Sequence, residues 1–354
     1  MKDDDHPKPD QIEGAPHPSE AHRIFGQDPA QSTFLDAYNT GRLHHGWLMT
    51  GPSGVGKATL AWRIARFLLA TPPQDDGGLF GAPELPTSLD IDPEHPVSRR
   101  MMSGAEPGLF TLRRPYDEKA KRLKAQITVD EVRKLKNFFA LSATDGGRRV
   151  VIVDSADEMN VNAANALLKL LEEPPARTTL LLVSHQPARL LPTIRSRCRE
   201  LRLGPLSPDD MANALAQAGI ETASDPAALA ELAAGSVGEA VRLENLSGMA
   251  IYSELVAIMD TLPRLDRPRA LKLAEAAAQR GAEEKRNLMF SLLDTLLMRL
   301  ARTGVTGQTP YADAAQGEAQ MLARLSPTPQ MGQLWAQASQ ETGARIRHGC
   351  RGQP

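Results

Sequence analysis

The chain has 354 residues, of which 41% are hydrophobic, and this size favours roughly two or three globular domains. Its formal net charge of −2 excludes a protein that attracts nucleic acid through a basic field over its whole surface. Its two cysteines, Cys198 and Cys350, are too few for a disulfide framework or a zinc site made of cysteines alone. Residues 1–20 lack the apolar core of a signal peptide, and no apolar run is long enough to span a membrane. We therefore expect a cytoplasmic protein with no membrane partner and with a disordered tail over residues 1–20.

A glycine-rich segment lies between a predicted strand and a predicted helix. Residues 47–50 are an apolar run, and residues 60–70 repeat apolar side chains at helical spacing. Strand, glycine loop, lysine and helix follow one another as in a P-loop, where backbone N–H groups and the helix N-terminus bind phosphate. The predicted phosphate-binding residues are Gly51, Ser53, Gly54, Val55, Gly56, Lys57, Ala58 and Thr59.

The position after the lysine departs from the P-loop pattern. A P-loop carries Ser or Thr there to hold Mg²⁺, whereas this chain has Ala58, with Thr59 one residue later. One residue turns a helix by about 100°, so we expect the Thr59 hydroxyl to point elsewhere. The motif alone leaves open whether the site is a working ATPase or a relic that binds nucleotide weakly.

Two more apolar runs, residues 149–154 and 178–184, predict buried parallel strands. The first ends in Asp154, the Walker B position from which a carboxylate holds Mg²⁺, and the second ends in Ser184. We add both residues to the predicted nucleotide site. Hydrolysing proteins of this layout usually have a Glu next, which polarises the attacking water, but here Ser155 follows Asp154. Because serine cannot take that proton unaided at neutral pH, the pattern favours loss of hydrolysis.

The region between the P-loop helix and Asp154 is rich in Pro, Gly and basic residues. Residues 71–110 predict a long, turn-rich insertion that ends in a short strand over residues 109–112. Residues 113–124 then contain six basic side chains. These belong either to a solvated loop, the favoured interpretation, or to a contact with a phosphate backbone.

Two adjacent histidines, His44 and His45, precede the P-loop strand. No third candidate ligand lies near them in the sequence, so the pair does not indicate a metal site. We interpret them as loop residues close to the base of a bound nucleotide.

The second half of the chain is helical in pattern. A helix over residues 160–173 is ended by two prolines. Short helices over residues 204–246 predict a small lid domain, and longer ones over residues 247–345 predict an all-helical domain. We expect its last helix at about residues 318–343, followed by a tail over residues 346–354.

In this order, the P-loop, the strand ending in Asp154, the helix segment Asn165–Pro175 and the tripeptide Ser196-Arg197-Cys198 resemble AAA+ clamp-loader subunits. The resemblance covers most of residues 22–245. It implies an α/β P-loop (AAA+) domain with a parallel sheet over residues 21–203, a helical lid, and a helical collar for oligomerisation. It also implies that Arg197 acts in trans, on the γ-phosphate of ATP bound by a neighbouring subunit. The alternative is a structural arginine that caps a helix C-terminus.

The departures from the family pattern favour a scaffold subunit that does not hydrolyse ATP. Ala58 lacks the hydroxyl for Mg²⁺, Ser155 replaces the catalytic acid, and Gly238 stands where motor subunits carry an arginine that senses phosphate. The resemblance then implies a weak or vestigial ATP site and, since no cysteine lies between the two motifs, no zinc. Its implied partners are motor and delta-type clamp-loader subunits, the sliding clamp and primed-template DNA. An ATP-hydrolysing motor subunit is the alternative, and a small-molecule P-loop phosphotransferase is disfavoured by the helical second half.

Overall fold

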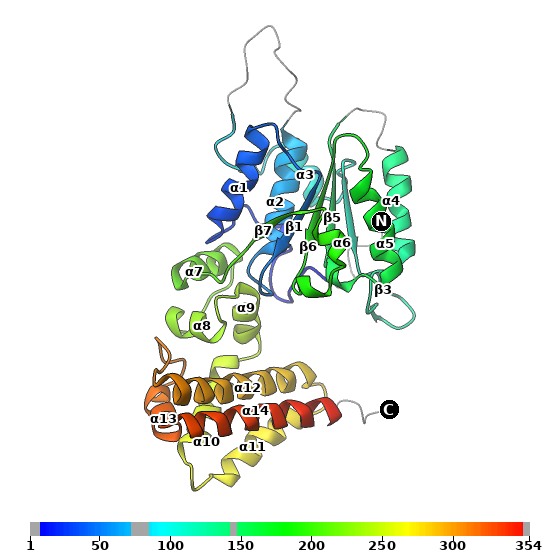
Figure 1. The fold of residues 1–354 in the computed structure, drawn as a ribbon. Helices are drawn as coiled ribbons and strands as arrows, with labels where there is room; N and C mark the ends of the chain where they lie inside the picture. The colour runs from blue at the N-terminus through cyan, green and yellow to red at the C-terminus, as the bar shows by residue number, and fades with distance from the viewer. Residues whose placement is uncertain (1–7, 72–84, 142–146, 350–354) are drawn as a thin grey trace. The chain divides into compact units, whose positions relative to one another are not determined.

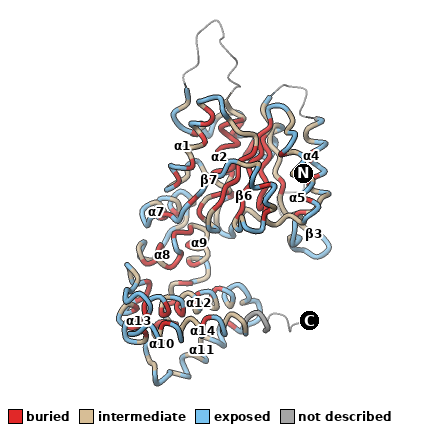
Figure 2. The backbone as a smooth tube through the Cα atoms, in the orientation of Figure 1, coloured by how far each residue is buried: buried red, intermediate tan, exposed pale blue. Residues whose placement is uncertain are grey.

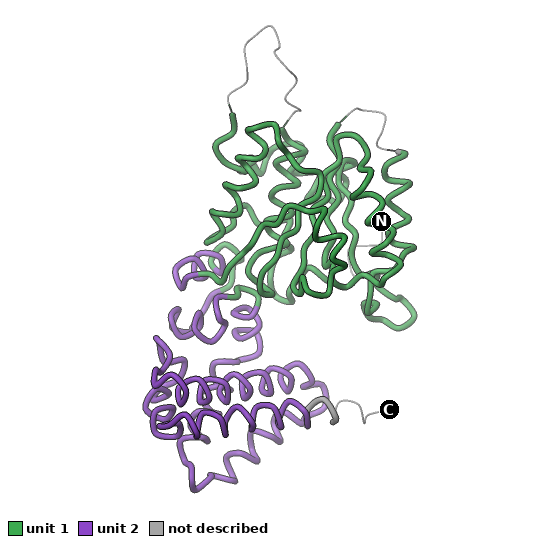
Figure 3. Tube along the Cα trace, in the orientation of Figure 1, with its two compact units in different colours: residues 1–206, 216–220, 236–238 green, residues 207–215, 221–235, 239–354 purple. Residues whose placement is uncertain are grey.

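The computed structural model describes residues 8–71, 85–141 and 147–349 (Figure 1). The chain divides into two compact units (Figure 3). Unit 1 comprises Met1–Leu206, Ala216–Ile220 and Ser236–Gly238, and unit 2 comprises Ser207–Leu215, Glu221–Gly235 and Glu239–Pro354. Within the described residues, the helices are too short or too polar to cross a membrane.

Unit 1 is built on a five-stranded parallel sheet with the strand order β2-β5-β6-β1-β7. The strands are β1 (Gly46–Thr50), β2 (Leu109–Arg113), β5 (Arg149–Asp154), β6 (Thr178–Val183) and β7 (Arg199–Arg202). Every residue of β1 and β6 is buried, as expected for strands covered on both faces. Because all five strands are parallel, their carboxyl ends meet at one edge of the sheet and their amino ends at the other.

Helices flank the sheet in Figure 1, and Figure 2 shows the buried backbone concentrated in the strands. One face packs Val151 and Val153 of β5 with Leu167 and Leu171 into a single apolar core. The helices of unit 1 are α1 (Asp28–Asn39), α2 (Lys57–Ala70), α3 (Pro96–Met102), α4 (Val129–Leu141), α5 (Val161–Glu172) and α6 (Pro192–Arg195), with short 3₁₀ turns η1 (Pro18–Glu20), η3 (Ala156–Glu158) and η4 (Pro187–Arg189). The α/β P-loop fold predicted from the sequence is confirmed.

The turn-rich region is more ordered than its composition predicts. Of the predicted insertion at residues 71–110, residues 72–84 lie outside the described part, while α3 forms within the remainder and β2 begins at Leu109. The basic segment after it forms a hairpin of β3 (Tyr116–Asp117) and β4 (Arg122–Leu123). The Asp117 carboxylate closes the turn by accepting the backbone N–H groups of Lys119 and Ala120, both at 3.0 Å.

The structure differs from the predicted disordered tail over residues 8–20. His17 is buried, and its Nε2 lies 2.9 Å from Asp10 Oδ2, while Arg113 of β2 reaches Asp10 Oδ1 at 3.2 Å. Burial alone would raise the pKa of Asp10, but the hydrogen bond and charge of His17, with the charge of Arg113, hold it below its usual value. On α2, Arg66 donates to Ser19 O and Arg63 donates to His22 O at 2.6 Å. A few buried ionic contacts therefore hold this polar segment in place, and composition cannot reveal such contacts.

The regular secondary structure of unit 2, up to residue 349, is helical. Its helices are α7 (Pro208–Gln217) and α9 (Val237–Asn245), each of which begins or ends in unit 1, together with α8 (Pro226–Leu232), α10 (Gly248–Asp260), α11 (Arg267–Ala278), α12 (Glu283–Thr306), α13 (Glu318–Leu325) and α14 (Pro329–Gly349). The single last helix predicted over residues 318–343 is wrong. Two helices replace it, because Pro327 removes a backbone donor between α13 and α14.

Two features hold these helices together. Glu318 is fully buried and accepts hydrogen bonds from Tyr252 at 2.5 Å and Arg299 at 2.8 Å. Elsewhere α12 and α14 approach closely where glycines face each other, since a Cβ added to Gly304 would lie 2.7 Å from the backbone nitrogen of Gly332.

Candidate functional site

The predicted P-loop joins the carboxyl end of β1 to the amino end of α2. Gly51 has φ +142° and Gly54 has φ +74°, conformations that residues with a Cβ rarely adopt. A Cβ on Gly51 would lie 2.3 Å from the Leu203 carbonyl oxygen, and one on Gly54 would lie 2.3 Å from Ser236 Oγ. Glycine is therefore required at both positions for the loop to keep this shape.

Lys57, the first residue of α2, is 2% exposed. Its Nζ donates to Gly51 O at 2.8 Å and also to Pro52 O, so the ammonium is bound by carbonyls of its own loop. Burial lowers the pKa of Lys57 to about 8, against the opposing charges of Asp154 and Asp157. A phosphate would have to replace the contacts to these carbonyls, so the cradle binds phosphate only after an exchange of partners.

Asp154 ends β5 at the same edge of the sheet and pairs in register with Arg113. Its carboxyl group is buried and lies 3.3 Å from Ser155 Oγ. Burial, followed by the negative charge of Asp10, raises the pKa of Asp154 to about 7, although the Ser155 hydrogen bond and Lys57 oppose the rise. This raised pKa describes the chain without a metal ion, and a bound cation would lower it.

The edge also holds polar residues that follow β6. Ser184 is fully buried, and its Oγ has no hydrogen-bond partner among the residues described here. The next residue, His185, donates its backbone N–H to Asp157 at 3.1 Å, and burial and the charge of Lys57 lower its pKa. From the sequence, Asp157 is interpreted as a charge at a helix start, and His185 is not predicted as a site residue. The available signal for His185 was its position shortly after β6, because residues that follow parallel strands gather at the carboxyl edge.

Gly238, at the predicted phosphate-sensing position, touches the P-loop directly. Its backbone N–H donates to Gly54 O at 3.1 Å. A Cβ on Gly238 would lie 2.7 Å from Ile12 Cδ1 and 3.0 Å from Gly54 Cα, so this arrangement has no room for a side chain. The residues at this edge fit a phosphate group, with Lys57 and Ser184 as its polar partners. For a magnesium ion the set lacks one ligand, since Ala58 has no side-chain oxygen where a P-loop carries Ser or Thr.

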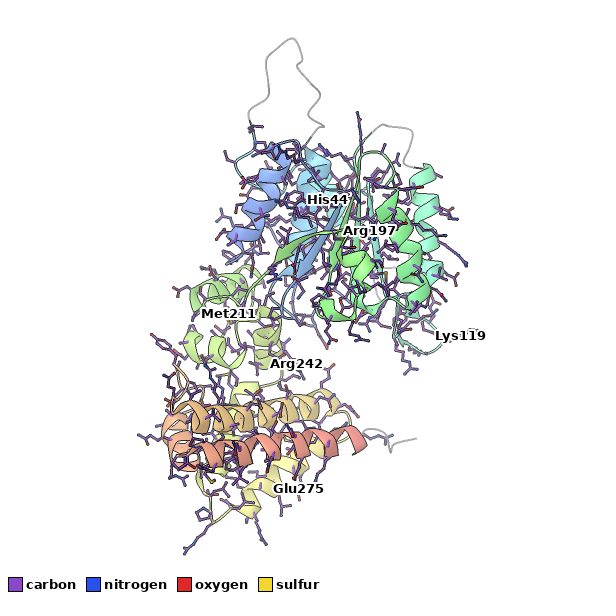
Figure 4. All side chains as sticks on the ribbon, viewed as in Figure 1. His44, Lys119, Arg197, Met211, Arg242 and Glu275 are labelled. Carbon is purple, nitrogen blue, oxygen red and sulfur yellow. The ribbon has the colours of Figure 1, made fainter. Side chains whose placement is uncertain are left out.

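Arg197 lies at the opposite edge of the sheet. It follows α6 and precedes β7, whose first residue, Arg199, pairs in register with Trp47 near the start of β1. At about 3.3 Å per residue, β1 separates this edge from the P-loop by about 15 Å. The Arg197 side chain is 37% exposed, and its guanidinium donates from Nη1 to Thr193 O at 3.1 Å and has Nη2 2.9 Å from Glu172 Oε1. Arg197 (Figure 4) therefore does not share a site with the phosphate cradle of its own chain.

The interpretation of His44 and His45 as neighbours of a nucleotide base is wrong. Both precede β1, at the amino edge, whereas the P-loop follows β1 at the carboxyl edge. The two rings stack with centroids 4.4 Å apart, and His45 Nε2 donates to the Leu171 carbonyl at 2.8 Å. Burial raises the pKa of the nearby Cys198 to about 12, so this thiol is a packing residue and not a nucleophile.

Comparison with known proteins places these features in a family. The family model described as DNA polymerase III, delta subunit matches residues 26–207, just over half of the chain. The DNA polymerase III subunit delta' of Pseudomonas aeruginosa is 37% identical over 225 residues, which cover 62% of this chain and 61% of that protein. The Escherichia coli subunit delta' is 35% identical over 219 residues, covering 61% and 59%.

The matched stretch thus spans about three fifths of the length of these relatives. Among solved structures, the Thermotoga maritima RuvB Holliday junction branch migration motor aligns with a TM-score of 0.41 and 15% identity, covering 82% of this chain and 80% of that one. The resemblance to clamp-loader subunits is confirmed by the family match and the delta' relatives. The chain belongs to the DNA polymerase III, delta subunit family, and within that family it is similar to the delta' subunits.

Proposed function

We propose that this chain is a scaffold subunit of a clamp loader of the delta' kind. In the assembled loader it supplies Arg197 in trans to ATP bound by a neighbouring motor subunit, and it helps to load the sliding clamp on primed-template DNA. The observation that carries the proposal is the position of Arg197: partly exposed, next to a turn, and at the edge of the sheet opposite its own phosphate cradle.

An arginine suits this role for a physical reason. During phosphoryl transfer, negative charge spreads over the phosphate oxygens and the leaving group, and a planar guanidinium can neutralise two oxygens at once. An arginine in its own site would be buried near Lys57, whereas Arg197 presents its head group to a neighbour. The Ser-Arg-Cys tripeptide in which it stands is the one that carries the resemblance to the family.

The chain's own P-loop is proposed to bind ATP weakly or not at all and to be inactive in hydrolysis. Ala58, Ser155 and Gly238 replace the groups that would hold Mg²⁺, activate water and contact the γ-phosphate. Each loss costs on the order of 10²-fold in rate, by comparison with other groups that stabilise transition-state charge. Three such losses in one site leave no useful turnover.

The same proposal assigns a role to each of the two helical regions. Residues 204–246 form the lid, and residues 247–345 form the collar through which the subunit joins motor and delta-type subunits. With only two cysteines in the chain, we propose that it carries no structural zinc. We further propose that it works in the cytoplasm, on DNA held by the whole loader.

The test is the ATPase activity of the reconstituted loader. Arg197→Ala is expected to lower the DNA- and clamp-stimulated rate by 10-fold or more, on the order of the loss seen for charge-stabilising groups, while the loader still assembles. Arg195→Ala is the matched control, since Arg195 is exposed two residues away on α6. An unchanged rate in the Arg197 variant contradicts the proposal.

The isolated chain gives a second measurement. It is expected to show negligible ATPase with or without primed DNA, and isothermal titration should detect ATP weakly or not at all. Brisk turnover by the isolated chain would instead identify an ATP-hydrolysing motor subunit.

A further inference from the structure

Arg197 is held by an acidic residue from another helix. Its Nη2 lies 2.9 Å from Oε1 of Glu172, the last residue of α5, while Nη1 donates to the Thr193 carbonyl at 3.1 Å. We propose that Glu172 is a positioning residue for Arg197: it fixes the orientation in which the guanidinium is presented to the neighbouring subunit. This inference rests on the proposed function, and it names Glu172 as the residue that orients Arg197 for that function.

The backbone of Glu172 is fixed independently of its side chain. The preceding residue, Leu171, is buried, and its carbonyl accepts a hydrogen bond from His45 Nε2 at 2.8 Å. A Cβ added to Gly46 would lie 2.9 Å from Leu171 Cδ2 and 3.2 Å from the carbonyl oxygen of Arg197. Three segments therefore pack together here: the end of α5, the start of β1 and the backbone of Arg197. This packing fixes the backbone that carries the Glu172 carboxylate.

The two contacts leave the guanidinium able to bind a phosphate. A guanidinium has five N–H donors in one plane, and the carbonyl and the carboxylate on Arg197 take one nitrogen each. The remaining donors stay in that plane, and its direction is set by two anchors from different elements, α6 and α5. A long side chain that is already oriented loses less freedom when the neighbour's phosphate arrives, so the transition state gains more from each hydrogen bond.

A purely stabilising role for this ion pair does not fit its exposure. The Arg197 and Glu172 side chains are 37% and 44% exposed, and ion pairs at such exposure add little to folding stability. His45 binds the Leu171 carbonyl near the end of α5, and the carbonyl that Arg197 binds belongs to Thr193 of α6, so the link between Arg197 and α5 is made by the Glu172 carboxylate. The pair thus contributes to the geometry of the arginine more than to the stability of the fold.

The experiment measures ATP hydrolysis by the reconstituted loader, with this chain as wild type, Glu172→Gln, Glu173→Gln, Arg197→Ala or the double variant Glu172→Gln/Arg197→Ala. Glu173 is the matched control, because it is exposed, adjacent, and without an ion pair in the described structure. We expect Glu172→Gln to lower kcat about two- to fivefold, the range that an exposed ion pair can supply, with KM for ATP and the thermal midpoint unchanged. In the double variant, Glu172→Gln should add nothing to the loss caused by Arg197→Ala.

The outcomes separate this inference from the one on which it rests. If Arg197→Ala slows the loader but Glu172→Gln behaves like Glu173→Gln, the positioning role is wrong and the arginine's role stands. A fall in the thermal midpoint that accompanies the loss of kcat, or additive losses in the double variant, also overturns the positioning role. If Arg197→Ala has no effect, the proposed function fails and the positioning role fails with it.

Discussion

Replacing Asp154 by asparagine should make unit 1 more stable, and the gain should grow with pH. Asp154 is 5% exposed at the end of β5, and its pKa is raised from 3.8 to about 7, chiefly by burial. A carboxyl whose pKa is higher in the folded than in the unfolded state destabilises the fold once it ionises. That cost begins as pH rises through the unfolded value and is complete above the folded value.

The size of this stability gain follows from the rise in the pKa of Asp154. A rise of about three pKa units corresponds to about 4 kcal/mol at 1.36 kcal/mol per unit, fully felt above about pH 7 and largely absent near pH 4. The Asp154→Asn variant lacks this cost, so its gain over the wild type should rise from near zero at about pH 4 to a few kcal/mol at about pH 8. Part of the gain is offset because Lys57 loses a neighbouring negative charge.

Urea unfolding between about pH 4 and pH 8, followed by tryptophan fluorescence, measures this difference. Trp47 and Trp62 are buried in unit 1, and a Trp335→Phe background removes the signal of the third tryptophan, in α14. Asp36→Asn is the control, because Asp36 is exposed on α1. If the free-energy difference between the Asp154 variant and the wild type is constant across this pH range, the reasoning about its burial is refuted.

Two further predictions concern the helical unit. Glu318→Gln should destabilise it by about 1.5–3 kcal/mol, because the largely buried guanidinium of Arg299 loses the nearer of its two carboxylates and keeps only Glu231 at 3.4 Å, and thermal unfolding followed by circular dichroism checks this. Gly304→Ala should cost about 1–3 kcal/mol, because its Cβ would lie 2.7 Å from Gly332 N. An unchanged unfolding midpoint in either variant would contradict the packing described above.

The sheet and the phosphate cradle could be predicted because each is encoded locally. The runs of β-branched and apolar residues at residues 149–154 and 178–183 leave no alternative to buried strands, and the strands appear there. The spacing of Gly51, Gly54 and Lys57 likewise prescribes a loop before a helix, which the structure contains. The roles assigned to the individual site residues remain predictions.

The features that could not be predicted depend on contacts between distant residues. His45 comes directly before β1, whereas the P-loop follows it. The histidine therefore lies at the amino end of the strand, away from the phosphate cradle, and binds the Leu171 carbonyl. Glu172 lies in a charged pair of residues before two prolines, and nothing in its own neighbourhood indicates Arg197 as its partner. The residues around Asp10 in the sequence do not indicate that it is buried, because acidic side chains are normally solvated.

The contact of Asp10 with Arg113 also bears on how the protein is made. The two residues are 103 positions apart, so the segment around Asp10 cannot make this contact until β2 has been synthesised. Until then its acidic and histidine side chains stay hydrated, and closing so long a loop is among the slower steps of folding. The segment around Asp10 therefore joins unit 1 only after β2 is available, later than contacts between residues that are close in the sequence.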